Sequence, residues 1–288
     1  MKSFTLPSYA KLNLALRVVA RRPDGFHELV TLFERIDLHD DVSFAPAKEG
    51  AFSMVCDDKR VPCDERNLIW KVASVLVKGE KVHKGAKIVI KKRIPVAAGL
   101  AGGSSNAAAA LQGLNKLWDL RLSQAKLLSY ARMIGSDVAF FLYDVPFAIG
   151  TGRGEMIKPL AVKAALWHFL VVPQAPLLTK DVYEHFAVSA QSFTNTGSDV
   201  NIILRSLEKN DPSGVGAGLF NDLEAPILVL KPHLGKLKAR VLRHDTLGVS
   251  FSGSGPSVFA VMASEKEARH LKKIFSRTYR QVFVVKTK

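Results

Sequence analysis

The chain has 288 residues, of which 48% are hydrophobic and 23% charged, enough to bury one large core or two smaller ones. Its apolar runs are too short to span a membrane, and its first residues lack the apolar core of a signal peptide. A formal net charge of +15 fits either a nucleic-acid or membrane partner or an enzyme with polyanionic substrates. We therefore expect a cytoplasmic enzyme or binding protein.

Two further features exclude common motif classes. The only cysteines, Cys56 and Cys63, stand seven residues apart, a spacing that matches no common zinc motif and favours free thiols in a reducing compartment. Basic residues are spread along the chain, with local concentrations at residues 91–93 and 266–288. Neither an aromatic RNA-binding signature nor a zinc finger accompanies them, so the charge alone leaves the partner open.

The first predicted element in chain order is a strand over residues 10–18, AKLNLALRV, in which apolar and polar side chains alternate. A period of two residues places Lys11 and Asn13 side by side on one face of this strand. The sequence RRPDGFH follows, and Pro-Asp-Gly is strong turn chemistry. We therefore expect Phe26 and His27 to emerge directly after a tight turn.

The remaining pattern alternates helices and strands. Helical spacing predicts helices over residues 67–77 and 107–118, and from Ser123 to a cap at Gly135, with Asp137 opening a further helix to residue 141. Strands are expected at residues 86–94, 166–172, 248–251, 258–262 and 281–285, and further helices near 180–186, 199–208, 219–230 and 265–275. This mixture predicts an α+β protein with an N-terminal domain over residues 1–160 and a C-terminal domain over residues 161–288.

Residues 95–111, PVAAGLAGGSSNAAAAL, run from a strand through a glycine-rich loop into an alanine-rich helix. Unpaired backbone N–H groups and the helix dipole place positive charge at such a helix start, and glycine lets an anion approach closely. The loop lacks the lysine of the Walker motif and the spacing of the dinucleotide fingerprint. The residues alone fit a phosphate site and a plain connection capped by Ser104 or Ser105 equally well.

Three segments together resemble the signature motifs of the GHMP small-molecule kinases, in that family's order and at about its spacing: residues 10–31, 95–111 and 249–261. The resemblance covers nearly the whole chain and implies the two-domain α+β fold of these kinases, with the active site in the interdomain cleft. It also implies ATP and Mg²⁺ as cofactors, with backbone groups and the helix dipole holding the phosphates in place of a lysine. The nucleotide loop is then formed by Pro95, Val96, Ala97, Ala98, Gly99, Leu100, Ala101, Gly102, Gly103, Ser104 and Ser105, the last also a candidate Mg²⁺ ligand.

The resemblance assigns the chemistry to two residues. Asp137 matches the family's catalytic aspartate and Lys11 its partner lysine, since an aspartate at a helix N-terminus beside a lysine can orient a hydroxyl and accept its proton. Asn67, Leu68 and Lys92 match positions of the adenine pocket. Each has a plainer alternative: a helix cap for Asp137 and Asn67, a core side chain for Leu68, and a solvated side chain for the lysines.

The sequence RRPDGFH resembles more narrowly a branch of the family whose alcohol acceptor carries a diphosphocytidyl group. By that resemblance, Phe26 and Tyr183 stack on the cytosine ring, and His27 recognises the base edge. An ordinary turn histidine and a packed helix tyrosine are the alternatives. The resemblance implies further acceptor contacts from Asn13, Thr179, Gly253 and Ser254.

The loop departs from the family pattern at three positions: Ala98 and Ala101, where glycine is usual, and Asn106, where aspartate is frequent. An alanine is tolerated if its φ angle stays negative. Position 26 also carries phenylalanine where tyrosine is more usual, which keeps the ring and removes the hydroxyl.

Three other functions compete with this interpretation. A relative acting on homoserine or mevalonate would have no base to stack on the RRPDGFH turn, and a nucleic-acid-binding protein would use the glycine loop on backbone phosphates. A catalytically inactive relative would bind nucleotide only, although both Lys11 and Asp137 are retained. We expect a kinase of a small-molecule substrate and ATP, without nucleic-acid or membrane partners, and either monomeric or weakly dimeric.

Overall fold

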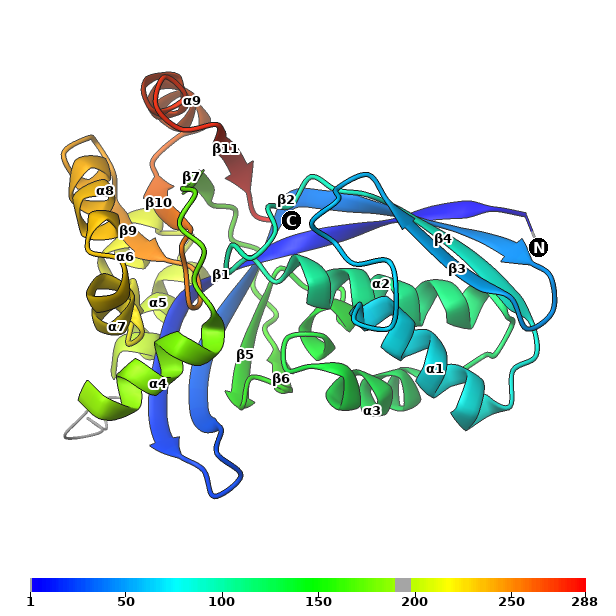
Figure 1. Ribbon diagram of the computed structural model, residues 1–288. Coiled ribbons are helices and arrows are strands. Elements are labelled where there is room, and N and C mark those ends of the chain that lie inside the picture. The colour runs from blue at the N-terminus through cyan, green and yellow to red at the C-terminus, as the bar shows by residue number, and fades with distance from the viewer. Residues whose placement is uncertain (1, 190–197) are drawn as a thin grey trace. The chain divides into compact units, whose positions relative to one another are not determined.

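The structure is a computed structural model that describes residues 2–189 and 198–288 (Figure 1). It divides into two compact units that are interleaved along the chain. Unit 1 contains Met1–Ala10, Leu38–Val96 and Ala101–Asp144, and unit 2 contains Lys11–Asp37, Ala97–Leu100 and Val145–Lys288. Two long strands, β1 (Phe4–Arg21) and β2 (His27–Ala47), contribute residues to both units. Each unit is described separately.

In unit 1, three helices cover one face of a group of strands (Figure 1). The end of β2 pairs antiparallel with β4 (Gly85–Lys91), which pairs parallel with β3 (Phe52–Cys56). The helices are α1 (Leu68–Glu80), α2 (Gly102–Leu117) and α3 (Gln124–Ile134), and a short 3₁₀ helix, η1 (Ala139–Leu142), follows. Helix α2 packs closely on β2, because a Cβ on Gly113 would lie 2.2 Å from the Phe44 ring.

The helix ends of unit 1 follow from capping side chains. Asn67 accepts a hydrogen bond from the backbone N–H of Ile69 at the start of α1, and Ser123 accepts one from Lys126 at the start of α3. Helix α1 ends at Lys81, whose backbone is left-handed. The glycine-rich loop therefore leads into the only one of these three helices that begins without a side-chain cap, α2.

Unit 2 is built around a four-stranded antiparallel sheet in the order β11-β7-β10-β9 (Figure 1). Its strands are β7 (Trp167–Val172), β9 (Gly248–Phe251), β10 (Val258–Met262) and β11 (Gln281–Lys286). Helix α9 (Glu265–Phe275) buries Ala268, Leu271 and Phe275, which recur at helical spacing, while α8 (His233–Leu242) buries Leu234, Leu237 and Val241 in the same hydrophobic core.

The rest of unit 2 surrounds the second part of β1 and the first part of β2. Strand β1 pairs parallel with β8 (Phe220–Asn221), while β2 pairs antiparallel with β5 (Phe147–Gly152), which pairs in turn with β6 (Met156–Pro159). The remaining helices are α4 (Thr179–Ser189), α5 (Ser198–Glu208), α6 (Pro212–Ala217) and α7 (Glu224–Leu230). Within the described residues, no helix combines the length and apolar character that crossing a membrane requires.

The predicted α+β class is confirmed, and most predicted elements are present. Two predictions are wrong. The helix expected over residues 219–230 is interrupted, because β8 occupies its start and only α7 is helical. The helix expected to open at Asp137 is the four-residue turn η1, which is too short to carry a useful dipole. The predicted division into domains over residues 1–160 and 161–288 stays a prediction, and the two compact units follow different boundaries.

Candidate active site

Lys11, in unit 2, has a buried and hydrogen-bonded charged side chain. It is 4% exposed, and its Nζ donates to Asn13 Oδ1 at 2.6 Å and to the carbonyl oxygen of Gly99 at 2.9 Å. Asn13 Nδ2 donates to Thr31 Oγ1 at 2.8 Å, and the Thr31 hydroxyl donates to the carbonyl of Ala15. The predicted pairing of Lys11 and Asn13 on one strand face is therefore present, and this chain of bonds fixes both side chains.

A turn near the C-terminus holds the glycine loop from the other side. Ser252 Oγ donates to the Gly99 carbonyl at 2.9 Å, so this carbonyl accepts from both Ser252 and Lys11, and Ser257 Oγ donates to the Ala98 carbonyl. Gly253 lies against Lys11, because a Cβ at this position would come 3.3 Å from Lys11 Nζ. Residues 11, 99 and 253, far apart in sequence, meet in one polar cluster of unit 2.

The turn itself is supported by a buried asparagine that sequence reasoning missed. Asn221 Nδ2 donates to the carbonyls of Phe251 and Gly253 at 3.0 and 2.8 Å. Two of the predicted acceptor residues, Thr179 and Ser254, share a hydrogen bond at 2.9 Å between their hydroxyl oxygens. The structure thus joins the start of α4 to the same turn.

The backbone of the glycine loop is left-handed at three positions, two of which are alanines. Gly99 has φ +74°, and Ala97 and Ala101 each have φ +54°. The condition of a negative φ therefore fails at Ala101, where an alanine costs about 1–2 kcal/mol relative to an unstrained backbone. At position 99 even an alanine would not fit, because a Cβ would lie 2.1 Å from the Ser252 carbonyl oxygen.

The first turn of α2 presents an open backbone on one side and a buried hydroxyl on the other. A Cβ on Gly103 would meet no atom within 4 Å, and Gly103 is exposed. Ser105, by contrast, is buried, and its Oγ accepts a hydrogen bond from Ser8 at 2.8 Å. The helix start can therefore receive an anion at Gly103, while Ser105 faces the protein interior.

Lys92 is bound by a buried carboxylate. Its Nζ lies 2.5 Å from Asp40 Oδ2, and the Asp40 side chain is fully buried. A Cβ on Gly102 would lie 3.2 Å from Lys92 Nζ, so the ammonium group packs on the first residue of α2. The positive charge that the loop sequence lacks is thus supplied near the helix start by a residue ten positions earlier in the chain.

The other predicted residues of unit 1 remain partly accessible. Leu68 is half-buried at the start of α1, so it is not the core leucine of the plainer alternative. Asn67 caps α1 through its Oδ1 and donates from Nδ2 to the Pro62 carbonyl, so both polar atoms of its amide are hydrogen-bonded. Asp137 is half-buried in the turn before η1.

Phe26 and His27 follow the predicted tight turn in unit 2. The turn has Gly25 at φ +84° and a hydrogen bond from the Phe26 N–H to Asp24 Oδ1. Phe26 is 53% exposed, and the guanidinium carbon of Arg153 lies 4.9 Å from its ring centroid. Sequence reasoning missed Arg153, although its motif GTGRG, rich in glycine around one arginine, was a usable signal.

His27 pairs with the predicted second aromatic residue. Its ring stacks on Tyr183 with centroids 5.2 Å apart and planes inclined by 26°. His27 is 9% exposed, and among the described residues its Nε2 has no hydrogen-bond partner. Burial lowers the pKa of His27, and the nearby charge of Arg21 lowers it further, so both effects favour the neutral imidazole.

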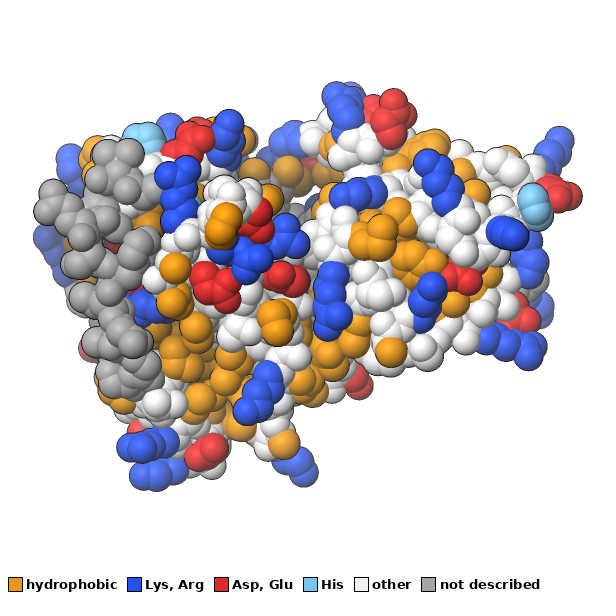
Figure 2. All heavy atoms as spheres, turned by 90° about the horizontal axis from the view of Figure 1, so that it is seen from below, with side chains coloured by type: hydrophobic (Ala, Val, Ile, Leu, Met, Phe, Trp, Pro, Cys, Tyr) orange, Lys and Arg blue, Asp and Glu red, His pale blue; other side chains and the backbone are white. Residues whose placement is uncertain are grey.

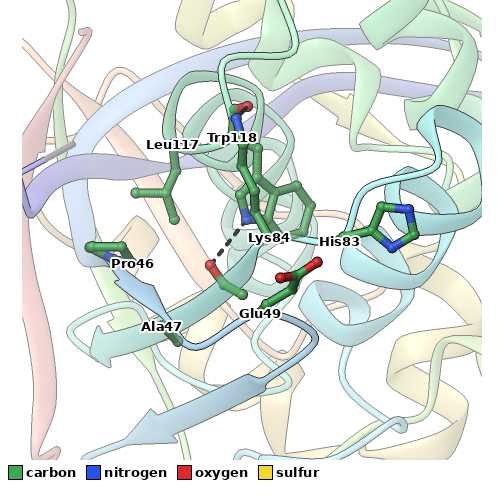
Figure 3. Close-up of a pocket in the computed structure, with 8 residues that line it drawn as sticks. Pro46, Ala47, Glu49, His83, Lys84, Leu117 and Trp118 are labelled. Carbon is green, nitrogen blue, oxygen red and sulfur yellow. Dashed lines mark hydrogen bonds between the residues drawn. The ribbon is translucent and has the colours of Figure 1, made fainter.

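A hollow of about 440 Å³ lies elsewhere in unit 1 (Figure 3). It is lined by Pro46, Ala47, Glu49, His83, Lys84, Gly85, Leu117 and Trp118, and Trp118 Nε1 donates to the Gly85 carbonyl. These residues surround the C-terminal end of α2. That end lies about 24 Å along the 16-residue helix from Gly102, so the hollow is separate from the glycine loop.

Two surface properties bear on the alternative functions. On the face drawn in Figure 2, Lys and Arg side chains are dispersed and interleaved with carboxylates instead of forming one basic surface. Among the described residues, no three His, Cys, Asp or Glu side chains are grouped to hold a metal ion. A dedicated metal cage therefore does not accompany the loop in this part of the chain.

The fold and the loop define a class of enzymes. Residues 67–145 match the family model of the GHMP kinase N-terminal domain, and residues 203–281 match that of the C-terminal domain. The chain is a GHMP kinase, and kinases of this family use ATP as the phosphate donor. A crystal structure of a homoserine kinase from Cytophaga hutchinsonii shares the fold, with a TM-score of 0.78 at 21% identity over 100% of this chain and 95% of that one.

More similar proteins define the family within that class. A protein from Shouchella clausii named 4-diphosphocytidyl-2-C-methyl-D-erythritol kinase is 42% identical over 92% of this chain and 87% of its own length. One of the same name from Pelotomaculum thermopropionicum is 36% identical over 96% of both chains. A crystal structure of 4-(cytidine 5'-diphospho)-2C-methyl-D-erythritol kinase has a TM-score of 0.84 at 31% identity, covering 99% of this chain and 100% of that one. The chain belongs to the family of 4-diphosphocytidyl-2-C-methyl-D-erythritol kinases.

Proposed function

We propose that the chain transfers the γ-phosphoryl group of ATP to the 2-hydroxyl of 4-diphosphocytidyl-2-C-methyl-D-erythritol, giving ADP and the 2-phosphate, a step of non-mevalonate isoprenoid precursor synthesis. The observation that carries the proposal is the buried ammonium of Lys11, held between Asn13 and the Gly99 carbonyl of the glycine loop. A desolvated cation anchored to a phosphate loop has a direct use in phosphoryl transfer, where negative charge accumulates on the transferred group.

In the proposed reaction, the 2-hydroxyl oxygen forms a bond to the γ-phosphorus while the bond from phosphorus to the β-γ bridging oxygen breaks. Asp137 orients the hydroxyl and accepts its proton. Lys11 stabilises the developing charge, and Asn13 keeps its ammonium in place. The short η1 turn contributes little to Asp137, so this role depends on the carboxylate itself and not on a helix dipole.

The nucleotide is proposed to bind along residues 95–105, with its phosphates against the exposed backbone of Gly103 at the start of α2. The half-buried Leu68, with Asn67 and Lys92, is proposed to border the adenine ring. The left-handed backbone of Ala97, Gly99 and Ala101 curves the loop as an anion-binding concavity requires.

We propose that Mg²⁺ enters with ATP, as part of the substrate complex. Mg²⁺ commonly binds through substrate phosphates, water and one or two protein groups, so the lack of a grouped metal site among the described residues is compatible with it. Ser105 remains the candidate ligand from the sequence. Its hydroxyl oxygen accepts from Ser8 with one lone pair and keeps a second for a metal ion, which the buried side chain reaches only by turning away from the protein interior.

The cytosine ring is proposed to stack on Phe26, whose exposed ring is available to a base, and His27 to bond the base edge through its unpaired Nε2. Tyr183 supports the His27 ring. Arg153, already over the Phe26 ring, adds a positive charge for the diphosphate. Thr179, Gly253 and Ser254 then surround the alcohol end of the acceptor.

The test is ADP release from Mg-ATP with the complete acceptor, set against homoserine, mevalonate and the acceptor stripped of its cytidylyl group. We expect turnover with the complete acceptor only, falling about 10²–10⁴-fold in Asp137→Asn. Asp245→Asn, which changes an exposed carboxylate in unit 2, serves as the matched control and should retain activity. Turnover with another acceptor would overturn the substrate assignment, and turnover with none of them, from folded protein, would overturn the proposed function.

A further inference from the structure

We propose that Asp40 is a positioning residue for nucleotide binding: it holds Lys92 and the first turn of α2 in the arrangement that receives the phosphates. The inference rests on the proposed function for its ligand, ATP. Asp40 belongs to none of the three signature segments and lies in β2, directly before the part of the strand that pairs with β4, within unit 1.

Both carboxylate oxygens of Asp40 accept two hydrogen bonds each, all from residues that flank the glycine-rich loop. Its Oδ1 accepts from the backbone N–H groups of Arg93 and Ile94 at 2.7 and 2.8 Å. Its Oδ2 accepts from Lys92 Nζ at 2.5 Å and from Asn106 Nδ2 at 2.9 Å. One fully buried carboxylate therefore ties the segment that leaves β4 to the helix that begins after the glycine loop.

The network continues beneath the helix start. Asn106 Nδ2 also donates to Ser8 Oγ at 2.8 Å, and Ser8 donates to Ser105 Oγ at 2.8 Å. The side chains of Ser8, Ser105 and Asn106 are buried, so water cannot replace a lost partner. The orientation of Ser105 and Asn106, both near the start of α2, thus depends on Asp40 through a continuous chain of hydrogen bonds.

The same arrangement explains why asparagine suits position 106. A carboxylate there would face Asp40 Oδ2 at hydrogen-bond distance, and two buried like charges repel. The amide instead donates to Asp40 and leaves that carboxylate to balance Lys92. Asp40 therefore neutralises Lys92 in the unliganded protein while keeping its ammonium against Gly102, next to the expected phosphate position.

Asp40→Asn tests this role with almost no change of shape. The amide oxygen can still accept from Arg93 and Ile94, but its NH₂ group then faces two donors, Lys92 and Asn106. We expect the dissociation constant for ADP, measured by calorimetry without turnover, and the KM for ATP to rise about tenfold or more. The KM for the diphosphocytidyl acceptor should stay within about twofold.

The neighbouring carboxylate supplies the control. Asp41 pairs with the side chain of Arg93 at 2.5 Å, and this pair is partly exposed, unlike the buried Asp40. Asp41→Asn should leave the ADP dissociation constant unchanged. A merely structural Asp40 would instead lower the melting temperature in Asp40→Asn and leave ADP affinity and both KM values as in the unchanged protein, which would overturn the proposal.

A double exchange gives the sharper test. In Asp40→Asn/Asn106→Asp, the amide and the carboxylate trade places, and Lys92 keeps a carboxylate nearby because its Nζ and the side chain of residue 106 contact the same Asp40 oxygen. We expect ADP affinity to recover at least partly relative to Asp40→Asn. Affinity no better than in Asp40→Asn, from folded protein, would count against the network.

If Asp40→Asn does not fold, Asn106→Ala provides the test, because it removes the hydrogen bonds from residue 106 to Asp40 and Ser8 and leaves Asp40 with its other donors. Weaker ADP binding with an unchanged acceptor KM supports the inference, and unchanged ADP binding overturns it. The proposed function is judged separately: ADP binding by the unchanged protein without phosphorylation of the acceptor contradicts that function and leaves the role of Asp40 measurable.

Discussion

The ammonium group of Lys11 is buried and donates hydrogen bonds to two protein oxygens, one from a side chain and one from a loop carbonyl. Replacing Lys11 by methionine keeps the aliphatic length and removes the charge. We expect Lys11→Met to lower kcat about 10²–10³-fold, the range found when one preorganised donor is lost, with little change in ADP affinity. Steady-state kinetics and ADP calorimetry measure the two effects.

Lys11→Arg is the informative companion. A guanidinium keeps the charge but cannot occupy the compact space between Asn13, Gly99 and Gly253, where even a Cβ on Gly253 would lie 3.3 Å from the ammonium. We therefore expect arginine to restore little activity. Full activity in Lys11→Arg would show that only the net charge matters at this position.

We expect the stability of the protein to depend on pH through the ionisation of His27. Its pKa is lowered in the folded protein from the ordinary 6.5, so the unfolded chain binds more protons in the interval between the two values. The free energy of unfolding therefore falls as the pH drops through that interval and levels off below the folded pKa. We expect His27→Gln to lose this component when urea unfolding is compared at about pH 7.5 and about pH 5.5.

The exposed His270 provides the reference for this measurement. His270→Gln should keep the decline of stability between the two pH values, because its imidazole lies on the exposed side of α9. The same decline in His27→Gln would mean that groups other than His27 cause it.

At the scale of elements, the glycine loop contains two glycines with opposite requirements. Gly99 has a left-handed backbone and no space for a Cβ, whereas Gly103 has open space around its Cα. We expect Gly99→Ala to lower the melting temperature and abolish nucleotide binding, because the Ser252 carbonyl has to move. Gly103→Ala should leave the melting temperature unchanged or higher, since alanine favours the helix, and weaken ADP binding by its methyl group alone.

Thermal unfolding and ADP calorimetry on the two variants separate folding from binding. Unchanged ADP affinity in Gly103→Ala would place the phosphates away from the start of α2. A stable, nucleotide-binding Gly99→Ala would show that the contact between the loop and residue 252 is dispensable.

Hydrophobic alternation and capping residues, which are local signals in the sequence, predicted strand β1 and several helix starts correctly. Alternation along residues 10–18 paired Lys11 with Asn13, and capping chemistry placed Asn67 and Ser123 at helix starts. Strand β2 was not predicted, because its 21 residues alternate poorly while they serve two units. The helix predicted at Asp137 is only a 3₁₀ turn, since a capping residue cannot extend a helix by itself.

The supporting residues of the site had no local signal. Asp40 and Asn106 are 66 positions apart, and Asn221 bonds carbonyls 30 and 32 positions later. Their types, aspartate and asparagine, are also the ordinary residues of turns and caps. Only the folded chain distinguishes a carboxylate that collects four donors from one that faces water.

For the whole molecule, the positive charge is unevenly distributed along the chain. Residues 231–288 hold 13 Lys and Arg against three Asp and Glu, which is most of the excess of +15. If this charge attracts ATP and the diphosphocytidyl acceptor, kcat/KM should fall steeply as ionic strength rises from about 0.01 M to about 1 M, where the Debye length shrinks from about 30 Å to about 3 Å. Steady-state kinetics over that range check the prediction.

Lys272→Gln/Lys273→Gln removes two exposed charges from α9 and distinguishes attraction from solubility. We expect a smaller salt dependence and a lower kcat/KM at low ionic strength, with kcat unchanged. Identical salt dependence in this variant would assign the C-terminal charge to keeping the protein in solution.

The Gly99 carbonyl accepts hydrogen bonds from residues at opposite ends of the chain, so the order of synthesis determines when both bonds can form. Lys11, the glycine loop and Asp137 are all synthesised within the first half of the chain, but the hydroxyl that completes the Gly99 carbonyl belongs to Ser252. A nascent chain that has not yet released that segment holds the proposed catalytic residues without the hydrogen bond from Ser252 to the Gly99 carbonyl. We therefore expect catalytic competence to arrive late in translation, and prematurely terminated products to carry the proposed catalytic residues without being active.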